Sequence, residues 1–241
     1  MNSMTARIRI LISFIFLPVF ALCQQKQIDS LEGLLKNPTV DTLQIDRLLM
    51  SSKLLWNSDP SLSLRRGKEA LVLSQRLADS HRIGLSYISI GNAYLIPFQN
   101  PDSAIVVYKK AISLTELSND KYVRAMALNN IGNCLKVKGK VGESQRFYEE
   151  ALVIRKEIHD SSGIAATTSN LGTVYYQKGD LKRALDLYYE ALPFKERDGN
   201  KAALASTYQN IGLVHLDRSE PDKAIEMIGK AKDLYILIGD V

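Results

Sequence analysis

The chain has 241 residues, of which 46% are hydrophobic and 24% charged, and its formal net charge is +5. This composition is that of an ordinary globular protein, and a chain of this length buries about two thirds of its unfolded surface. Because the charges are interspersed rather than gathered in the basic stripe that phosphates require, nucleic acid is excluded as the expected partner.

The first residues differ from the rest of the chain. Arg7 and Arg9 precede an uncharged apolar run from Ile10 to Leu22, which is 13 residues long and too short to cross a bilayer as a helix. This pattern predicts a secretory signal peptide over residues 1–23, with cleavage after Cys23. Two alternatives stay open, in which Cys23 is acylated as a lipoprotein anchor or the segment remains as an uncleaved anchor helix. The predicted location is outside the bacterial cytoplasm, in the periplasm or cell envelope.

Cleavage after Cys23 would remove two basic side chains and leave a formal charge of +3. It would also leave Cys134 as the single cysteine, which cannot form an internal disulfide. The mature chain is therefore expected to depend on packing alone for its stability.

After the leader, residues 24–38 are predicted to form a short helix that ends before Pro38. Residues 39–80 contain two helical segments joined by an Asp-Pro turn, and we interpret them as a divergent capping hairpin. Trp56 is expected to pack near the turn of this hairpin.

A repeat of 40 to 41 residues occupies the remainder of the chain. A glycine and an alanine each recur with this period, at Gly91, Gly132, Gly172 and Gly212 and at Ala111, Ala151, Ala191 and Ala231. Within each unit the apolar residues recur every three or four positions, which indicates amphipathic helices. Gly179 and Asp180 form a turn between two of these segments, with the aspartate suited to cap the second helix. Each unit is therefore predicted to be a helical hairpin, and a fixed period of this length predicts a stacked array.

The pattern resembles the tetratricopeptide repeat in a 40-residue form. The resemblance rests on the Leu-Gly or Ile-Gly pair of each first helix, an aromatic residue near the end of some first helices, and an alanine, an aromatic residue and a closing alanine in the second helix. It implies an all-α fold, an α-α superhelix of about five hairpins over residues 39–80, 81–119, 120–159, 160–199 and 200–241.

The small residues need a physical reason, because a glycine inside a helix costs about 1 kcal/mol relative to alanine. We expect the recurrent glycines to allow the backbones of the two helices in a hairpin to approach closely. Alanines at the facing positions are expected to do the same between hairpins.

A row of amide side chains recurs beside the glycines. The resemblance implies that first helices line a concave groove, and amides offer both a donor and an acceptor to the backbone of an extended peptide. The candidate groove residues are Asn92, Asn129, Asn130, Asn133, Asn170, Tyr176, Gln177, Gln209 and Asn210. The alternative is that the asparagines bridge adjacent helices or are simply solvated.

The sequence offers little to support catalysis. Its three histidines fall in different units, and the GKVGES segment at 139–144 lacks the spacing of a phosphate-binding loop. We therefore predict no catalytic residue, no metal and no cofactor, so that any catalytic domain would lie beyond residue 241.

The expected partner is a protein or peptide. An alternative function is suggested by a resemblance to the extracytoplasmic sensor part of bacterial membrane histidine kinases or nucleotide cyclases, in which such repeats precede a membrane helix. Leu234, Ile236, Leu237 and Ile238 near the end of the chain are expected to face a partner, a second copy or a further part of a longer protein, because solenoids need a polar terminal surface. A membrane role would come only through an uncleaved leader or a segment beyond residue 241.

Overall fold

The computed structural model describes residues 25–36 and 41–238. The predicted leader, Cys23 and Pro38 lie outside these residues. Residues 25–35 form a short helix, followed by ten longer ones. These are α2 (Thr42–Leu54), α3 (Pro60–Arg76), α4 (Ser80–Leu95), α5 (Pro101–Ser118), α6 (Lys121–Val137), α7 (Val141–Glu157), α8 (Ser161–Gln177), α9 (Leu181–Asp198), α10 (Lys201–Asp217) and α11 (Pro221–Ile238).

Most of these helices begin at a capping side chain. The carboxylate of Asp180, for example, accepts a hydrogen bond from the backbone amide of Arg183 at 3.0 Å, which satisfies one of the free amides at the start of α9. Gly179 immediately before it has a φ of +79°, a conformation that glycine adopts without strain. The sequence predicted both features of this turn.

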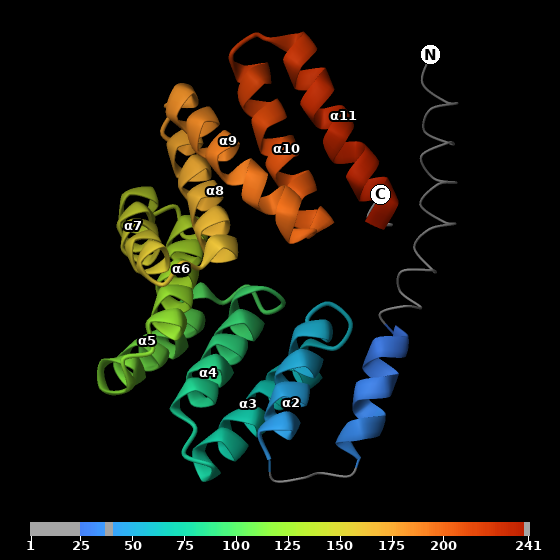
Figure 1. The fold of residues 1–241 in the computed structure, drawn as a ribbon, viewed down its shortest axis with the longest axis vertical. Helices are drawn as coiled ribbons and strands as arrows, with labels where there is room; N and C mark the ends of the chain where they lie inside the picture. The colour runs from blue at the N-terminus through green and yellow to red at the C-terminus, as the bar shows by residue number, and fades with distance from the viewer. Residues whose placement is uncertain (1–24, 37–40, 239–241) are drawn as a thin grey trace.

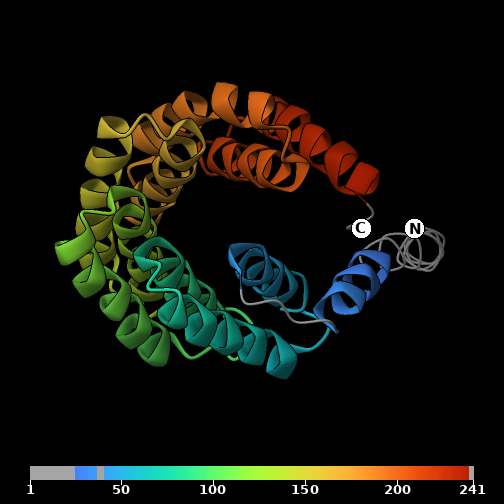
Figure 2. The same ribbon diagram turned by 60° about the horizontal axis from the view of Figure 1, so that its bottom comes forward.

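The helices pair into successive antiparallel hairpins, α2/α3, α4/α5, α6/α7, α8/α9 and α10/α11 (Figure 1). We refer to the even-numbered helices as first helices and to the odd-numbered ones as second helices. The array rises as it turns, so that α2 and α3 lie at one end of Figure 1 and α11 at the other. Seen from the direction of Figure 2, the helices follow one another around an open ring. The fold is the predicted all-α superhelix.

The curvature follows from which helices touch. Successive first helices contact one another, α2 with α4, α4 with α6, α6 with α8 and α8 with α10, whereas successive second helices of the described chain have no comparable contacts. In a curved stack the inner elements approach while the outer ones fan apart. The first helices therefore form the concave face, and the second helices form the convex face.

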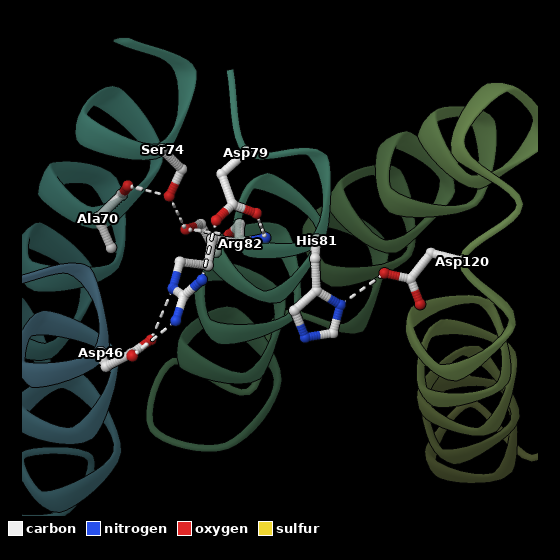
Figure 3. A network of polar contacts seen from close by, with 8 residues as sticks. Asp46, Ala70, Ser74, Asp79, His81, Arg82 and Asp120 are labelled. Carbon is white, nitrogen blue, oxygen red and sulfur yellow. Dashed lines mark hydrogen bonds and ion pairs between the residues drawn. The ribbon is translucent and has the colours of Figure 1, made fainter. Parts of the chain in front are cut away.

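The hairpins are held together by an apolar core and by polar ties at the helix starts. Figure 3 shows Arg82 at the start of α4, whose guanidinium donates to both carboxylate oxygens of Asp46 on α2, at 2.8 and 2.9 Å. The same group donates to Asp79, and these charged partners raise the pKa of Arg82. Nδ1 of His81 lies 2.6 Å from Oδ2 of Asp120, the residue that caps α6. The Arg82–Asp46 and His81–Asp120 contacts each join the first helix of one hairpin to the neighbouring hairpin.

At Gly91, Gly132 and Gly172 the glycine makes room for a side chain of the second helix, which corrects the expected reason for these three. At Gly212 an added Cβ would also lie 3.3 Å from the backbone oxygen of Ala224, so the expected backbone approach holds there. A Cβ added to Gly132 would lie 2.6 Å from Cε1 of Tyr148 on the second helix, and Gly172 faces Tyr188 in the same way. Gly91 faces Tyr108, whereas Gly212 faces the smaller Ile228. The glycine thus forms the floor of a slot for a buried aromatic ring.

The closing alanines Ala111, Ala151, Ala191 and Ala231 are all buried on their second helices. No helix of the described residues is long and apolar enough to cross a membrane.

Candidate functional site

The asparagines of the concave face form a continuous hydrogen-bonded chain, which we call the amide ladder. Nδ2 of Asn130 donates to Oδ1 of Asn92 at 3.0 Å, which connects α6 to α4. Nδ2 of Asn129 donates to Oδ1 of Asn130 at 3.2 Å, and Oδ1 of Asn129 in turn accepts from Nδ2 of Asn170 on α8 at 3.1 Å. The ladder therefore spans three successive first helices.

All of these bonds run in one direction, so the ladder has polar ends. Nδ2 of Asn92 and Oδ1 of Asn170 make no hydrogen bond within the described residues. Asn92, Asn130 and Asn170 are half-buried, whereas Asn129 is only 7% exposed and also accepts from Thr167 Oγ1 at 3.2 Å. The asparagines of the ladder thus bridge adjacent helices, which was the alternative interpretation of the sequence. Because Asn129 is nearly buried and its side-chain oxygen already accepts two hydrogen bonds, it bridges helices rather than facing a ligand, which corrects its assignment as a groove residue.

The tyrosines that fill the glycine slots also reach the concave face. Tyr148 donates its hydroxyl to Oδ1 of Asn133 at 2.8 Å, and Tyr108 donates to Oδ1 of Asn92 at 2.6 Å. Tyr188 donates to Thr173 at the equivalent position of α8, at 3.0 Å, and burial raises its pKa to about 12. In these three hairpins the residue that follows the glycine is therefore held by a hydrogen bond from a tyrosine hydroxyl, and Asn133 is one of these residues.

In the last hairpin both members of this hydrogen-bonded pair are replaced by apolar residues. Leu213 on α10 stands in place of the acceptor, and Ile228 on α11 stands in place of the tyrosine. Loss of the phenol and of its acceptor together leaves no buried polar group unsatisfied. The concave face accordingly becomes more apolar toward α10.

The remaining candidate residues lie further along the face or at its end. Tyr176 at the end of α8 is half-buried and hydrogen-bonds to Asp217 of α10, and this bond is the main cause that raises the pKa of the phenol. Gln177 beside it is exposed. Asn210 occupies the position equivalent to Asn170 and makes no hydrogen bond within the described chain.

Gln209 differs from its repeat equivalents in its surroundings. Its repeat equivalents, Asn129 and Ser169, are buried against the following first helix, whereas Gln209 is exposed and accepts from Tyr235 of α11 at 3.1 Å. The described residues contain no later hairpin to cover it. Gln209 therefore lies at the end of the described stack, and its assignment as a groove residue stays a prediction.

A cavity of about 280 Å³ opens on the concave face between α2, α4 and α6. It is lined by Asn92 at the start of the ladder, and by Lys53 and Trp56, which the sequence did not place in the groove. The divergent first hairpin lacks the repeat markers, so its residues could not be aligned with the groove positions of the other repeats. The single tryptophan of the chain was the available signal.

Two lysines near the packed interfaces are poorly solvated. Burial lowers the pKa of Lys136, the groove-side residue at the position equivalent to Tyr176. Burial also lowers the pKa of Lys195 on α9 to about 8, while its ammonium donates to Thr207 Oγ1 at 2.8 Å. The thiol of Cys134 is buried, and its pKa is raised to about 12 by burial. None of these groups forms a metal site, and the described part of the chain holds no cluster of three metal-ligating side chains.

Comparison with known proteins agrees with the repeat geometry. Residues 123–197, which span α6 to α9, match the tetratricopeptide repeat family. This part of the superhelix is therefore similar to tetratricopeptide repeats. Among curated proteins none matches the sequence significantly.

Solved tetratricopeptide-like structures align over most of this superhelix. BtubC from P. vanneervenii is 20% identical, with a TM-score of 0.66, over 94% of this chain and 93% of that one. A Rap protein complexed with Competence and Sporulation Factor gives a TM-score of 0.72 at 15% identity, and aspartyl phosphate phosphatase F from Bacillus subtilis gives 0.61 at 12%. These two alignments cover 91% and 85% of this chain but only 61% and 62% of the other protein. At these identities the likeness concerns the fold alone.

Proposed function

We propose that the chain is a scaffold that binds a protein or peptide segment along its concave face. The observation that carries this proposal is the amide ladder with its open ends. A row of half-buried amides fixed by interhelical bonds presents an unpaired donor at Asn92 and an unpaired acceptor at Asn170. An extended peptide backbone offers the complementary groups, and a pre-organised site loses less entropy when it binds.

A structural neighbour is consistent with this proposal. The Rap protein named above was solved as a complex with Competence and Sporulation Factor, on a fold that this chain shares over 91% of its length. The proposal assigns no catalytic residue to the chain.

Titration with a labelled peptide library tests the proposal. The variant Asn92→Ala/Asn170→Ala removes the amides at both ends of the ladder. It is expected to weaken the binding of those peptides that bind the wild-type chain. The matched control replaces Glu116 and Glu190, two exposed residues of second helices on the convex face, with alanine. If the ladder variant binds every peptide as tightly as the wild type, the concave amides are not the binding surface.

Export is a separate part of the proposal and rests on residues 1–23. Amino-terminal sequencing of the protein recovered from the cell envelope is expected to begin at Gln24. An amino terminus at Met1 in a cytoplasmic fraction would contradict export, and a lipid-modified Cys23 would replace cleavage with anchoring.

A second candidate function is that of the sensor portion of a membrane signalling protein. It is favoured by the apolar surface of the last hairpin, where Ile225 is 71% and Leu237 64% exposed. Exposed apolar side chains at the end of a repeat stack can serve as a contact with another element. The reading frame after codon 241 provides the test, because an apolar segment of about 20 residues there would support a membrane helix, and an immediate stop codon would remove this candidate.

A further inference from the structure

The cavity on the concave face has walls suited to a large apolar group. Leu49 of α2, Leu85 and Ile88 of α4 and Met126 of α6 contribute aliphatic and thioether surface, and Trp56 contributes an aromatic surface. Its volume of about 280 Å³ lies just below the range of about 300–1,000 Å³ that holds a drug-sized molecule. The space therefore suits one large side chain together with part of its backbone.

The polar groups around the cavity are nearly all donors without partners. Lys53 is exposed and makes no ion pair or hydrogen bond within the described residues. Nδ2 of Asn92 is likewise unused, and the buried Nε1–H of Trp56 has no acceptor. The donors that a ligand oxygen could use here are therefore the ammonium of Lys53 and Nδ2 of Asn92.

The lining contains no acidic residue. Ser89, the remaining polar residue of the lining, is already paired through its hydroxyl with Ser52 at 2.7 Å. The unsatisfied chemistry of the cavity is thus one cation and one neutral donor around an apolar centre. A complementary ligand supplies an apolar side chain, acceptor oxygens and a negative charge.

We propose that this cavity is a specificity subsite that takes a large apolar side chain of a bound peptide, with the carboxylate of an adjacent acidic residue held by Lys53. The inference rests on the proposed peptide-binding function and deepens it. Because the concave face continues past the cavity along the amide ladder to α8, the occupant is an internal segment of an extended peptide, with the ladder holding the residues that follow.

The single tryptophan of the chain makes the subsite directly observable. Trp56 is the only indole in the sequence, so its fluorescence reports on this cavity alone. The probes are ten-residue peptides with acetylated and amidated ends, made of Gly, Ser and Gln around a central Leu-Asp pair. Control peptides carry Ala-Asp or Leu-Asn at the same place, and one further peptide ends in Leu with a free carboxylate.

We expect the Leu-Asp peptide to change the Trp56 emission in a saturable manner. Truncation of Leu to Ala is expected to weaken binding by at least about tenfold, and Asp to Asn by about two- to fivefold, because Lys53 is exposed and its ion pair is screened. Lys53→Met should abolish the preference for Asp over Asn while it preserves the preference for Leu over Ala. The matched control Lys68→Met, an exposed lysine of α3, should change neither preference.

Three outcomes would overturn the subsite. The first is equal binding of the Leu-Asp and Ala-Asp peptides, and the second is an unchanged preference for Asp in Lys53→Met. The third is binding of the free-acid peptide alone, which would mean that a chain terminus provides the carboxylate. If labelled library peptides still bind the chain in these cases, the scaffold function survives the loss of the subsite. If no library peptide binds at all, the proposed function fails with it.

Discussion

Gly132 and Tyr148 belong to opposite helices of one hairpin, and the glycine leaves the space that the tyrosine ring fills. A methyl group at Gly132 would lie 2.6 Å from Cε1 of the ring, closer than real Cβ atoms approach a neighbour. The ring is wholly buried, and its hydroxyl reaches Asn133 on the concave face. One glycine thus connects the packing of the hairpin with the surface proposed to bind a ligand.

Gly132→Ala is expected to lower the free energy of unfolding by roughly 1–3 kcal/mol, since the wholly buried ring would have to shift to admit the methyl group. Urea denaturation followed by circular dichroism measures the change. Gly229→Ala is the matched control, because Gly229 also lies inside a helix but has no atom within 4 Å of an added Cβ. The control should gain about 0.5–1 kcal/mol. Equal effects of the two substitutions would show that the tyrosine slot does not constrain the glycine.

Asn129→Ala is expected to destabilise the chain by about 1–3 kcal/mol, because Thr167 and Asn170 both lose the oxygen to which they donate. The same denaturation experiment applies. Asn210→Ala removes an amide with no hydrogen bond within the described residues and should stay within about 0.5 kcal/mol of the wild type. A neutral Asn129→Ala would mean that the ladder contributes nothing to the stack.

Lys195 predicts a specific pH dependence of stability. Its pKa is lowered to about 8 by burial, below the ordinary value of 10.5, so the unfolded chain binds the proton more tightly. The resulting loss of stability is fully present below pH 8 and disappears as the pH rises to about 10.5. Lys195→Met should therefore stabilise the chain at pH 7 by about 1–3 kcal/mol, with a gain that shrinks toward pH 10.5.

Chemical denaturation at several pH values measures this difference. Lys182→Met on the same helix is the control for the loss of an exposed ammonium group. A constant gain for Lys195→Met from pH 7 to pH 10.5 would contradict the assigned burial cost.

Cys134 is expected to be chemically inert in the folded chain. The thiolate is the reactive form, and burial holds the pKa of this thiol at about 12. In a Cys23→Ser variant, a thiol-specific chromogenic reagent at pH 8 should react slowly with the native protein and rapidly after unfolding in urea. Fast modification of the native state would instead support a redox role for Cys134.

The exposed face of the last hairpin is expected to mediate association. Ile225→Lys/Leu237→Lys should shift the sedimentation coefficient toward that of the monomer without lowering the melting temperature, since both side chains already face solvent. Val153→Lys replaces an equally exposed apolar residue, 68% accessible, on the packed hairpin α6/α7 and should leave sedimentation unchanged. If the wild type sediments as a monomer at every concentration, self-association through this face is wrong.

The sequence by itself determined the helices and their repetition. Gly179 and Asp180 marked a turn, and the 40-residue beat of glycines and alanines predicted stacked hairpins, because periodicity and turn chemistry are local properties of the chain. The all-α superhelix followed from these local signals together with the resemblance they carried.

Only the tertiary structure decided what each repeated position touches. Asn129 and Gln209 share a register position, yet one is buried in the ladder and the other is exposed, because α8 packs against Asn129 and the described residues contain no first helix after α10. Trp56 and Lys53 gain their place through α4 and α6, which are distant in the sequence. The burial and the hydrogen-bond partners of a residue depend on neighbours from other helices that the stack brings together. The period of the sequence does not specify these neighbours.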